Sequence, residues 1–152
     1  MQLDFDPEQI SYAQLADIFW NNHCPEVKTG KRQYASILFF HDDMQKDIAA
    51  SYIQQQESLL GGKIYTELTP YSGFYRAEDY HQKYYLQISR DLFAELGKYY
   101  TTISELTDST AAARINGYLK GAGSIEELMQ EIDGFGLSDK GQKRIIQIAE
   151  NY

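Results

Sequence analysis

The chain has 152 residues, 24% charged and 43% hydrophobic, which is ordinary for a globular protein. This length suggests one domain that needs no metal or disulfide, and a single cysteine, Cys24, allows no internal disulfide. A net charge of −8 argues against nucleic acid, whose phosphates would be repelled. No basic leader and no run of about 18 apolar residues occurs, so we expect neither a signal peptide nor a membrane span. We therefore expect a cytoplasmic protein that binds neither nucleic acid nor membrane.

The first part of the chain is predicted to alternate strands with helices. Alternating apolar and polar residues mark the strands, and apolar residues three and four apart mark the helices. Residues 33–40 are apolar almost throughout, which predicts a central strand buried on both faces. The predicted elements, in order, are a strand over residues 2–6, a helix over 11–23, a strand over 33–40, a helix over 42–60 and a strand over 63–68.

The ends of the two predicted helices carry capping signals. Ser11 is the expected N-cap of the first helix, and Asp42 or Asp43 is that of the second. The pair Gly61 and Gly62 ends the second helix, and we expect the second glycine to take a positive φ.

The stretch over residues 70–87, PYSGFYRAEDYHQKYYLQ, is the centre of the predicted organisation. It opens as a turn and holds six aromatic rings. A helix that begins near Ala77 would place an acid, an imidazole, an amide and a ring on one face, namely Glu78, His81, Gln82 and Tyr85. Two interpretations remain open, a pocket wall or an aromatic corner that fills a core beside a solvated helix.

Residues 88–152 contain no strand-like run. Four short helices are predicted there, over residues 90–100, 109–120, 124–132 and 138–150. Ser124 and Glu127 form an expected capping box, and Asp108 or Ser109 is expected to cap the second of these helices. The predicted fold class is therefore α/β (α+β), a two-layer sandwich with a small β-α-β-α-β core and an all-helical C-terminal extension. The predicted domains are residues 1–87 and 88–152, with the second packing on the first.

Three segments resemble the peptide methionine sulfoxide reductase A family and follow in its order. They are FDPEQISYAQLADIFWNNH, QYASILFFHDDMQKDIA and ELTPYSGFYRAEDYHQKYYLQ. The resemblance covers about residues 3–87 and corresponds to the later portion of the family domain. It implies reduction of the S epimer of methionine sulfoxide, free or within proteins, and hence protein repair under oxidative stress. The helical tail resembles extensions that some members carry.

The chain also departs from the family pattern. The family's nucleophile lies near its N-terminus in a Gly-Cys-Phe-Trp motif, which does not occur in these 152 residues. The loop before the QY motif usually carries an aspartate, and here residues 28–32 read Lys-Thr-Gly-Lys-Arg, which we interpret as a solvated basic loop. We expect the chain to lack the family nucleophile and to be inactive in isolation, a truncated member or a pseudoenzyme.

The resemblance implies which residues hold the substrate. In the family a thiolate attacks the sulfoxide sulfur, and another thiol, from thioredoxin or a dithiol as external reductant, resolves the sulfenic acid. Tyr34 corresponds to the tyrosine that donates a hydrogen bond to the sulfoxide oxygen, and Asp79 and His81 correspond to the AEDYHQ wall of the pocket. Phe74 and Tyr75 are the expected aromatic contacts. The alternative is that Tyr34 is a packed strand tyrosine and His81 a satisfied structural histidine.

Cys24 could be recruited as a nucleophile with His23 as its base, or it is an ordinary cysteine. The negative end of a helix disfavours a thiolate, which favours the ordinary cysteine. Neighbouring acids such as Glu78 and Asp79 would point to different helix faces, so no metal site is predicted.

Three functional hypotheses remain. In the first, a second chain or an absent segment supplies the missing half, and the complete enzyme reduces methionine-S-sulfoxide. In the second, the chain is a catalytically inactive module that binds a methionine-sulfoxide-containing peptide or protein. In the third, Cys24 is the nucleophile. A scaffold role is a further class, in which the helical tail or a second copy in a homodimer covers an exposed sheet edge.

Overall fold

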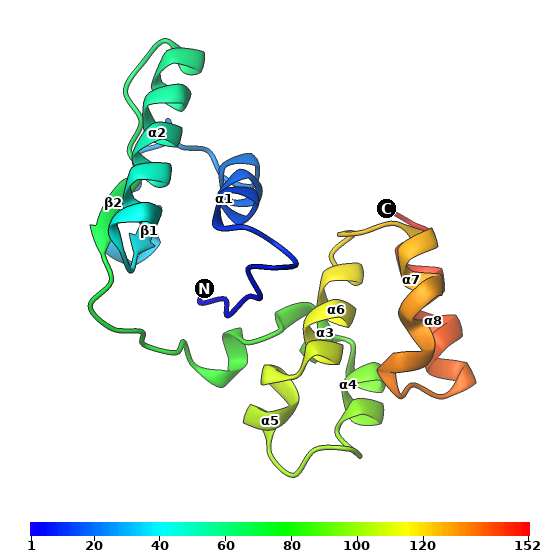
Figure 1. Cartoon of the computed structure of the whole chain (residues 1–152). Coiled ribbons are helices and arrows are strands. Elements are labelled where there is room, and N and C mark those ends of the chain that lie inside the picture. Colours follow the sequence, from blue (N-terminus) through cyan, green and yellow to red (C-terminus); the bar gives the residue numbers. More distant parts are fainter. The chain divides into compact units, whose positions relative to one another are not determined.

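The computed structural model describes residues 1–152, which divide into two compact units, Met1–Phe74 and Tyr75–Tyr152 (Figure 1). Each unit has its own cluster of buried hydrophobic residues. These units are defined by packing, whereas the predicted division at residue 87 follows the extent of a family resemblance. That division stays a prediction.

The first unit is a mixed α/β arrangement. The chain forms α1 (Tyr12–Asn21), the 3₁₀ turn η1 (Arg32–Tyr34), β1 (Ile37–Phe40), α2 (Asp43–Leu60) and β2 (Glu67–Pro70). The two strands pair in parallel, with Ile37 opposite Glu67 and Phe40 opposite Pro70. Helix α2 forms the crossover between them and contacts both strands, and α1 packs beside α2 (Figure 1). A parallel pair needs such a crossover, because its strands run in the same direction.

The predicted caps of these helices form. The Ser11 side chain accepts a hydrogen bond from the Gln14 N–H, and the Gln14 side chain accepts one from the Ser11 N–H. Asp42 caps α2 by accepting from the Gln45 N–H at 2.7 Å. The prediction for the glycine pair was wrong, because Gly61 takes the left-handed conformation, with a φ of 64°. It follows Leu60 directly and has no Cβ, so it is the first residue able to end the helix in this way.

Two strand predictions need correction. Residues 2–6 form no strand, and Leu3 in that segment is 58% exposed. An alternating pattern shows only that one face suits burial, and a strand also needs a partner for its backbone. The sheet has two strands only, so β1 is not a central strand, and none of its residues is fully buried, with Phe39 43% exposed.

The third predicted strand begins later than expected, at Glu67. The preceding residues have other partners, since the Tyr65 N–H donates to the Pro25 carbonyl at 2.7 Å and Ile64 is buried in the cluster around Trp20. The predicted class nevertheless holds, because the chain is a mixed α/β protein with a helical C-terminal part.

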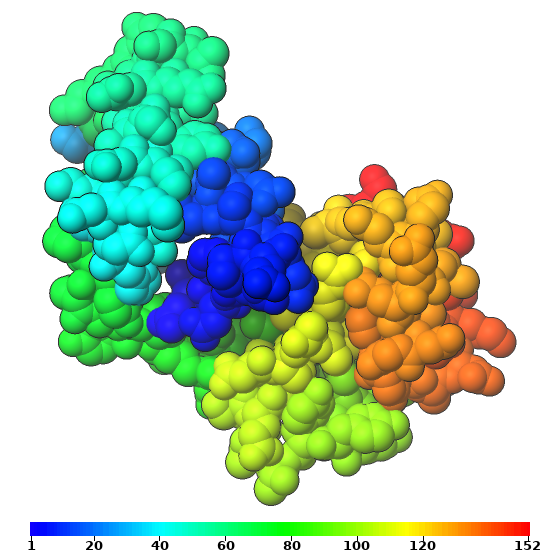
Figure 2. Space-filling view, in the orientation of Figure 1, coloured from blue at the N-terminus to red at the C-terminus, as the bar shows by residue number.

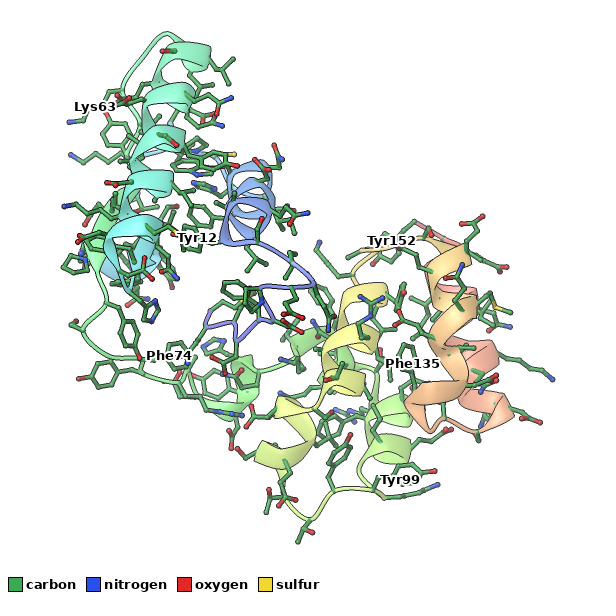
Figure 3. The ribbon with its side chains drawn as sticks, viewed as in Figure 1. Tyr12, Lys63, Phe74, Tyr99, Phe135 and Tyr152 are labelled. Carbon is green, nitrogen blue, oxygen red and sulfur yellow. The ribbon has the colours of Figure 1, made fainter.

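The second unit is entirely helical. Its elements are η2 (Asp79–His81), α3 (Tyr84–Ile88), α4 (Arg90–Leu96), α5 (Ile103–Asp108), α6 (Thr110–Tyr118), α7 (Ile125–Glu131), η3 (Ile132–Phe135) and α8 (Asp139–Ala149). Thirteen buried hydrophobic residues form one core, to which Phe135 contributes (Figure 3). In Figure 2 the helices coloured yellow to red form one closely packed surface. None of the helices is both long and apolar enough to cross a membrane.

The helix predicted to begin near Ala77 does not form. Residues 75–78 have no regular structure, η2 is a single 3₁₀ turn, and α3 begins only at Tyr84. The Gln82 side chain donates to the Ala77 carbonyl at 2.9 Å, which satisfies an acceptor that a helix would have used. Lys83 has a φ of 47°, which breaks any continuous helical path. The expected helical face of acid, imidazole, amide and ring is therefore absent.

The caps in the helical part are as predicted, with one helix missed. Ser109 caps α6, and Ser124 with Glu127 forms the capping box of α7. Helix α5 was not predicted, although Thr102 and Glu105 form a capping box at its start. The signal was present in the sequence, but the helix has only six residues and a short apolar stripe.

Gly123 is a position in the second unit where a side chain would meet both backbone strain and a buried ring. Its φ is +86°, and an added Cβ would lie 2.7 Å from the buried ring of Tyr118. We expect Gly123→Ala to lower the free energy of unfolding by about 1–2 kcal/mol, from backbone strain and displacement of that ring. Urea denaturation measures the change. Gly134→Ala is the matched control, because its φ is ordinary and nothing lies within 4 Å of the added carbon; an equal loss in both variants would contradict the explanation.

Candidate active-site residues and family membership

The residues predicted to bind substrate are divided between the two units. Tyr34 ends the 3₁₀ turn η1 in the first unit, and its N–H donates to the Lys31 carbonyl at 3.0 Å. The side chain of Tyr34 is 63% exposed, so it is not a packed core tyrosine in this structure. Phe74 is the last residue of the first unit and is 48% exposed. Both rings are therefore accessible to a ligand.

Asp79, His81 and Tyr75 belong to the second unit. The imidazole of His81 lies 4.2 Å from the ring of Tyr80 and 4.0 Å from a Glu78 carboxylate oxygen. Its side chain is 59% exposed, and Tyr75 is 94% exposed. The turn thus presents a ring, an imidazole and carboxylates to solvent. That these groups combine with Tyr34 into one pocket stays a prediction.

Arg76, which the sequence analysis did not single out, fixes this turn to the helical core. Its guanidinium donates to the Thr107 hydroxyl at 2.7 Å and forms an ion pair with Asp108 at the end of α5. It also lies 3.8 Å from a carboxylate oxygen of Asp79. The hydrogen bond from Arg76 holds the pKa of Asp108 below its usual value. The partners lie more than 30 positions away, so no local pattern marks Arg76 as an anchor.

Replacing Arg76 should loosen the turn without unfolding the core. We expect Arg76→Ala to lower the free energy of unfolding by about 1 kcal/mol, because the lost hydrogen bonds are charge-assisted but Asp108 is largely exposed. The rate of amide hydrogen exchange at residues 76–82 should rise by more than the fall in the global free energy of unfolding explains. Arg90→Ala is the control, since Arg90 is exposed and forms no ion pair. Equal exchange rates in the two variants would show that Arg76 anchors nothing.

Cys24 is an exposed free cysteine, and the neighbouring histidine is otherwise engaged. His23 lies 2.8 Å from the Phe19 carbonyl through Nδ1 and 2.8 Å from the Thr66 hydroxyl through Nε2. A carbonyl only accepts, so Nδ1 carries the proton and donates, and in the neutral ring Nε2 accepts from Thr66. The imidazole joins the end of α1 to the residue before β2. It has no free nitrogen with which to deprotonate Cys24.

Two hollows occur on the second unit. One, of about 140 Å³, is lined by residues of α6 and α7 that include Arg114, Tyr118 and Glu127, and the other, of about 480 Å³, lies mainly along α8. Neither is lined by a residue predicted from the family motifs. No group of three or more His, Cys, Asp or Glu side chains is arranged to hold a metal ion.

The class of protein follows from these observations. The first unit has a parallel strand pair joined by a helical crossover, with an exposed tyrosine just before the first strand. The second unit is a helical bundle that begins with a turn of aromatic, acidic and imidazole side chains. The chain is therefore a mixed α/β protein with a helical extension. Comparison with known families identifies the family within this class. The family described as peptide methionine sulfoxide reductase matches residues 1–109, and the helical domain of selenoprotein methionine sulfoxide reductase A matches residues 103–150. The chain therefore belongs to the peptide methionine sulfoxide reductase family, which confirms the resemblance.

Individual relatives agree with this assignment. The chain is 42% identical to a peptide methionine sulfoxide reductase of Drosophila melanogaster over 140 residues, which are 91% of this chain and 56% of that protein. It is 41% identical to peptide methionine sulfoxide reductase MsrA of Sulfolobus acidocaldarius over 90 residues, 56% of this chain and 51% of that protein. It is 36% identical to the chloroplastic reductase A4 of Arabidopsis thaliana over 89 residues, 55% of this chain and 34% of that protein. The chain thus spans about half the length, or less, of these relatives.

Proposed function

We propose that this chain forms the substrate-holding part of a reductase for methionine-S-sulfoxide in proteins, and that its role is protein repair. The family match over residues 1–109 is the observation that supports the proposal most strongly. Reduction of methionine sulfoxide in peptides is the activity named for each of the relatives above. The substrate is a peptide or protein that contains methionine sulfoxide.

The chemistry assigns a limited role to the residues of this chain. A thiol attacks the sulfoxide sulfur, the S–O bond breaks, and the products are methionine and a cysteine sulfenic acid. A second thiol, from thioredoxin or a dithiol, then forms a disulfide with that sulfur and releases water. Tyr34 donates a hydrogen bond to the sulfoxide oxygen, and Phe74 and Tyr75 contact the substrate methyl and sulfur. Sulfur–ring contacts are worth roughly 0.3–1.5 kcal/mol each.

The attacking thiol in this proposal is not Cys24. Both ring nitrogens of His23 are engaged, so the neighbouring base is occupied. The family's Gly-Cys-Phe-Trp segment, from a second chain or another part of the native protein, supplies the thiol. The direct test is complementation, in which this chain is mixed with a polypeptide that carries that segment and methionine-S-sulfoxide turnover with dithiothreitol is measured. We expect turnover only in the mixture, and turnover by this chain alone that disappears in Cys24→Ser would contradict the assignment.

A second candidate is a catalytically inactive module that binds sulfoxide peptides. The exposure of Tyr34, at 63%, favours it, because the ring is open to a ligand without any further segment. Fluorescence anisotropy with a labelled methionine-sulfoxide peptide tests this role. Loss of binding in Tyr34→Phe but not in Tyr84→Phe, an exposed tyrosine of the helical unit, together with no turnover in the mixture, would favour the binding module over the enzyme.

A further inference from the structure

Positive charge in the first unit is concentrated in one place. This unit carries five Lys and Arg against ten Asp and Glu, so it is acidic as a whole. Four of the five cations nevertheless lie either in the loop before Tyr34 or just before β2, namely Lys28, Lys31, Arg32 and Lys63. The cations of this acidic unit are therefore grouped in two neighbouring segments.

Contacts bring these two segments together around the ring of Tyr65. The Nζ of Lys28 lies 6.0 Å from the ring centroid and that of Lys63 lies 5.6 Å from it. The hydrogen bond from the Tyr65 N–H to the Pro25 carbonyl fixes the loop to the approach of β2. Lys63 projects outward from the ribbon in Figure 3, and Tyr65 is 39% exposed. Two ammonium groups therefore share one accessible aromatic surface.

Most of this positive charge has no carboxylate partner within the chain. Arg32 is paired with Glu67, whereas Lys28, Lys31 and Lys63 take part in no ion pair. We call these three the lysine patch. The acids in these two segments are Glu26 and Glu67. Four cations against two acids leave a surplus of two positive charges. The patch therefore favours an anionic ligand.

One lysine of the patch, Lys31, lies in the same turn as the residue proposed to hold the sulfoxide. The Lys31 carbonyl accepts the hydrogen bond from the Tyr34 N–H at 3.0 Å, so one turn presents both the ammonium and the phenol. Unpaired surface charges act over about 10 Å at moderate salt, which is roughly three residues of an extended peptide. A peptide whose sulfoxide oxygen reaches Tyr34 would place its flanking side chains within range of the patch.

We propose that the lysine patch selects peptide segments in which methionine sulfoxide is flanked by Asp or Glu. The inference rests on the proposed function, because it assumes that Tyr34 marks the sulfoxide position. Each exposed ion pair changes affinity by about two- to fivefold, so two flanking acids that pair with lysines of the patch give roughly tenfold tighter binding than a neutral peptide. High salt should remove most of this preference, because the pairs are solvent-exposed.

The test compares labelled peptides that differ only in the residues around one methionine sulfoxide, with Glu, Gln or Lys on both sides. Dissociation constants are measured by anisotropy with the full chain at low and high salt. The patch variant is Lys28→Glu, Lys31→Glu and Lys63→Glu together. The control variant reverses Lys98, Lys140 and Lys143 of the helical unit to Glu, which gives the same net charge, and circular dichroism checks that both variants fold.

We expect the patch variant to bind the Glu-flanked peptide about tenfold more weakly than the native chain does, which removes the preference for acidic flanks. Its affinity for the Gln-flanked peptide should stay unchanged. Equal binding of the Glu- and Gln-flanked sulfoxide peptides by the native chain would overturn the inference and leave the proposed function intact. Equal losses in the patch and control variants would also overturn it, because net charge alone would then explain the effect. If the Glu-flanked peptide binds as well with unoxidised methionine, the chain binds acidic peptides without reading the sulfoxide, and both the proposed function and this inference fail.

Discussion

Expressed alone, residues 75–152 should unfold in one cooperative transition, whereas residues 1–74 should show none. The second unit has thirteen buried hydrophobic residues in a single core. The core cluster of the first unit contains three, Ala16, Trp20 and Ile64. Burial of apolar side chains is the main favourable term in folding, at about 1.5–3 kcal/mol for each large side chain. Two large side chains and one alanine cannot offset the conformational entropy of more than seventy ordered positions.

The surface of the first unit leads to the same expectation. Its sheet has two strands, and three or more strands are usually needed for independent stability. Several large apolar side chains remain exposed, among them Leu3, Phe39, Met44 and Leu59. This exposure leads to the same expectation, that the small core of the first unit is not sufficient on its own.

The chain contains its own reporter for this prediction. Trp20 is the only tryptophan and is 4% exposed within the first unit. We expect the fluorescence of the 1–74 fragment to resemble that of the urea-unfolded chain, while the 75–152 fragment keeps a sigmoidal melt in far-ultraviolet circular dichroism. A cooperative transition of the 1–74 fragment, with Trp20 shielded at low temperature, would show that its small core is sufficient.

Local signals in the sequence were sufficient to locate most helix starts. Ser11, Ser109 and Ser124 each cap a helix as predicted, because an N-cap bond joins residues only two or three positions apart. Strand predictions fared worse, since residues 2–6 have a strand pattern but no pairing partner. The helix predicted near Ala77 failed because side-chain contacts and the positive φ of Lys83 override a sequence with no obvious breaker.

For the candidate site, too, the sequence predicted local features but not long-range contacts. Tyr34 and the aromatic-acid-imidazole turn were found through motifs that lie in continuous segments of sequence. The contacts that support them could not be predicted in this way, because the partners are far apart in the sequence. Arg76 and Thr107 are 31 residues apart, and His23 and Thr66 are 43 residues apart. A histidine that follows a helix can act as a general base or can hold two segments together through hydrogen bonds. Only the positions of the two groups that contact its ring nitrogens distinguish these roles.

The second large effect should come from Arg114, which joins α6 to α7. Its Nε lies 2.9 Å from both carboxylate oxygens of Glu131, and a terminal nitrogen donates to the Tyr118 hydroxyl at 3.2 Å. Tyr118 is 3% exposed and donates its own hydroxyl hydrogen to Glu131. We expect Arg114→Met to lower the free energy of unfolding by about 2–3 kcal/mol, less than for a fully buried pair because the guanidinium is half exposed. Arg144→Met is the control, since its contact with Asp91 is long, at 3.8 Å.

The same cluster should make the helical unit sensitive to acid. Hydrogen bonds from Arg114 hold the pKa of Glu131 below its usual value. A folded pKa below the unfolded one means that the stabilisation is complete above the ordinary glutamate pKa and is lost as pH falls through the folded value. Asp108, whose pKa Arg76 lowers, contributes with the same sign. The melting temperature of the native chain should therefore fall steeply below about pH 4.5.

Glu131→Gln separates this effect from general acid denaturation. The variant should be less stable than the native chain at neutral pH, and the difference should shrink as pH falls, because protonation removes the same charge from the native protein. Glu126→Gln on the same helix is the control, since that exposed acid takes part in no ion pair or side-chain hydrogen bond. Melting curves at a series of pH values measure both. If the native chain and Glu131→Gln lost stability in parallel down to pH 3, the pairing of Arg114 with Glu131 would contribute nothing that depends on charge.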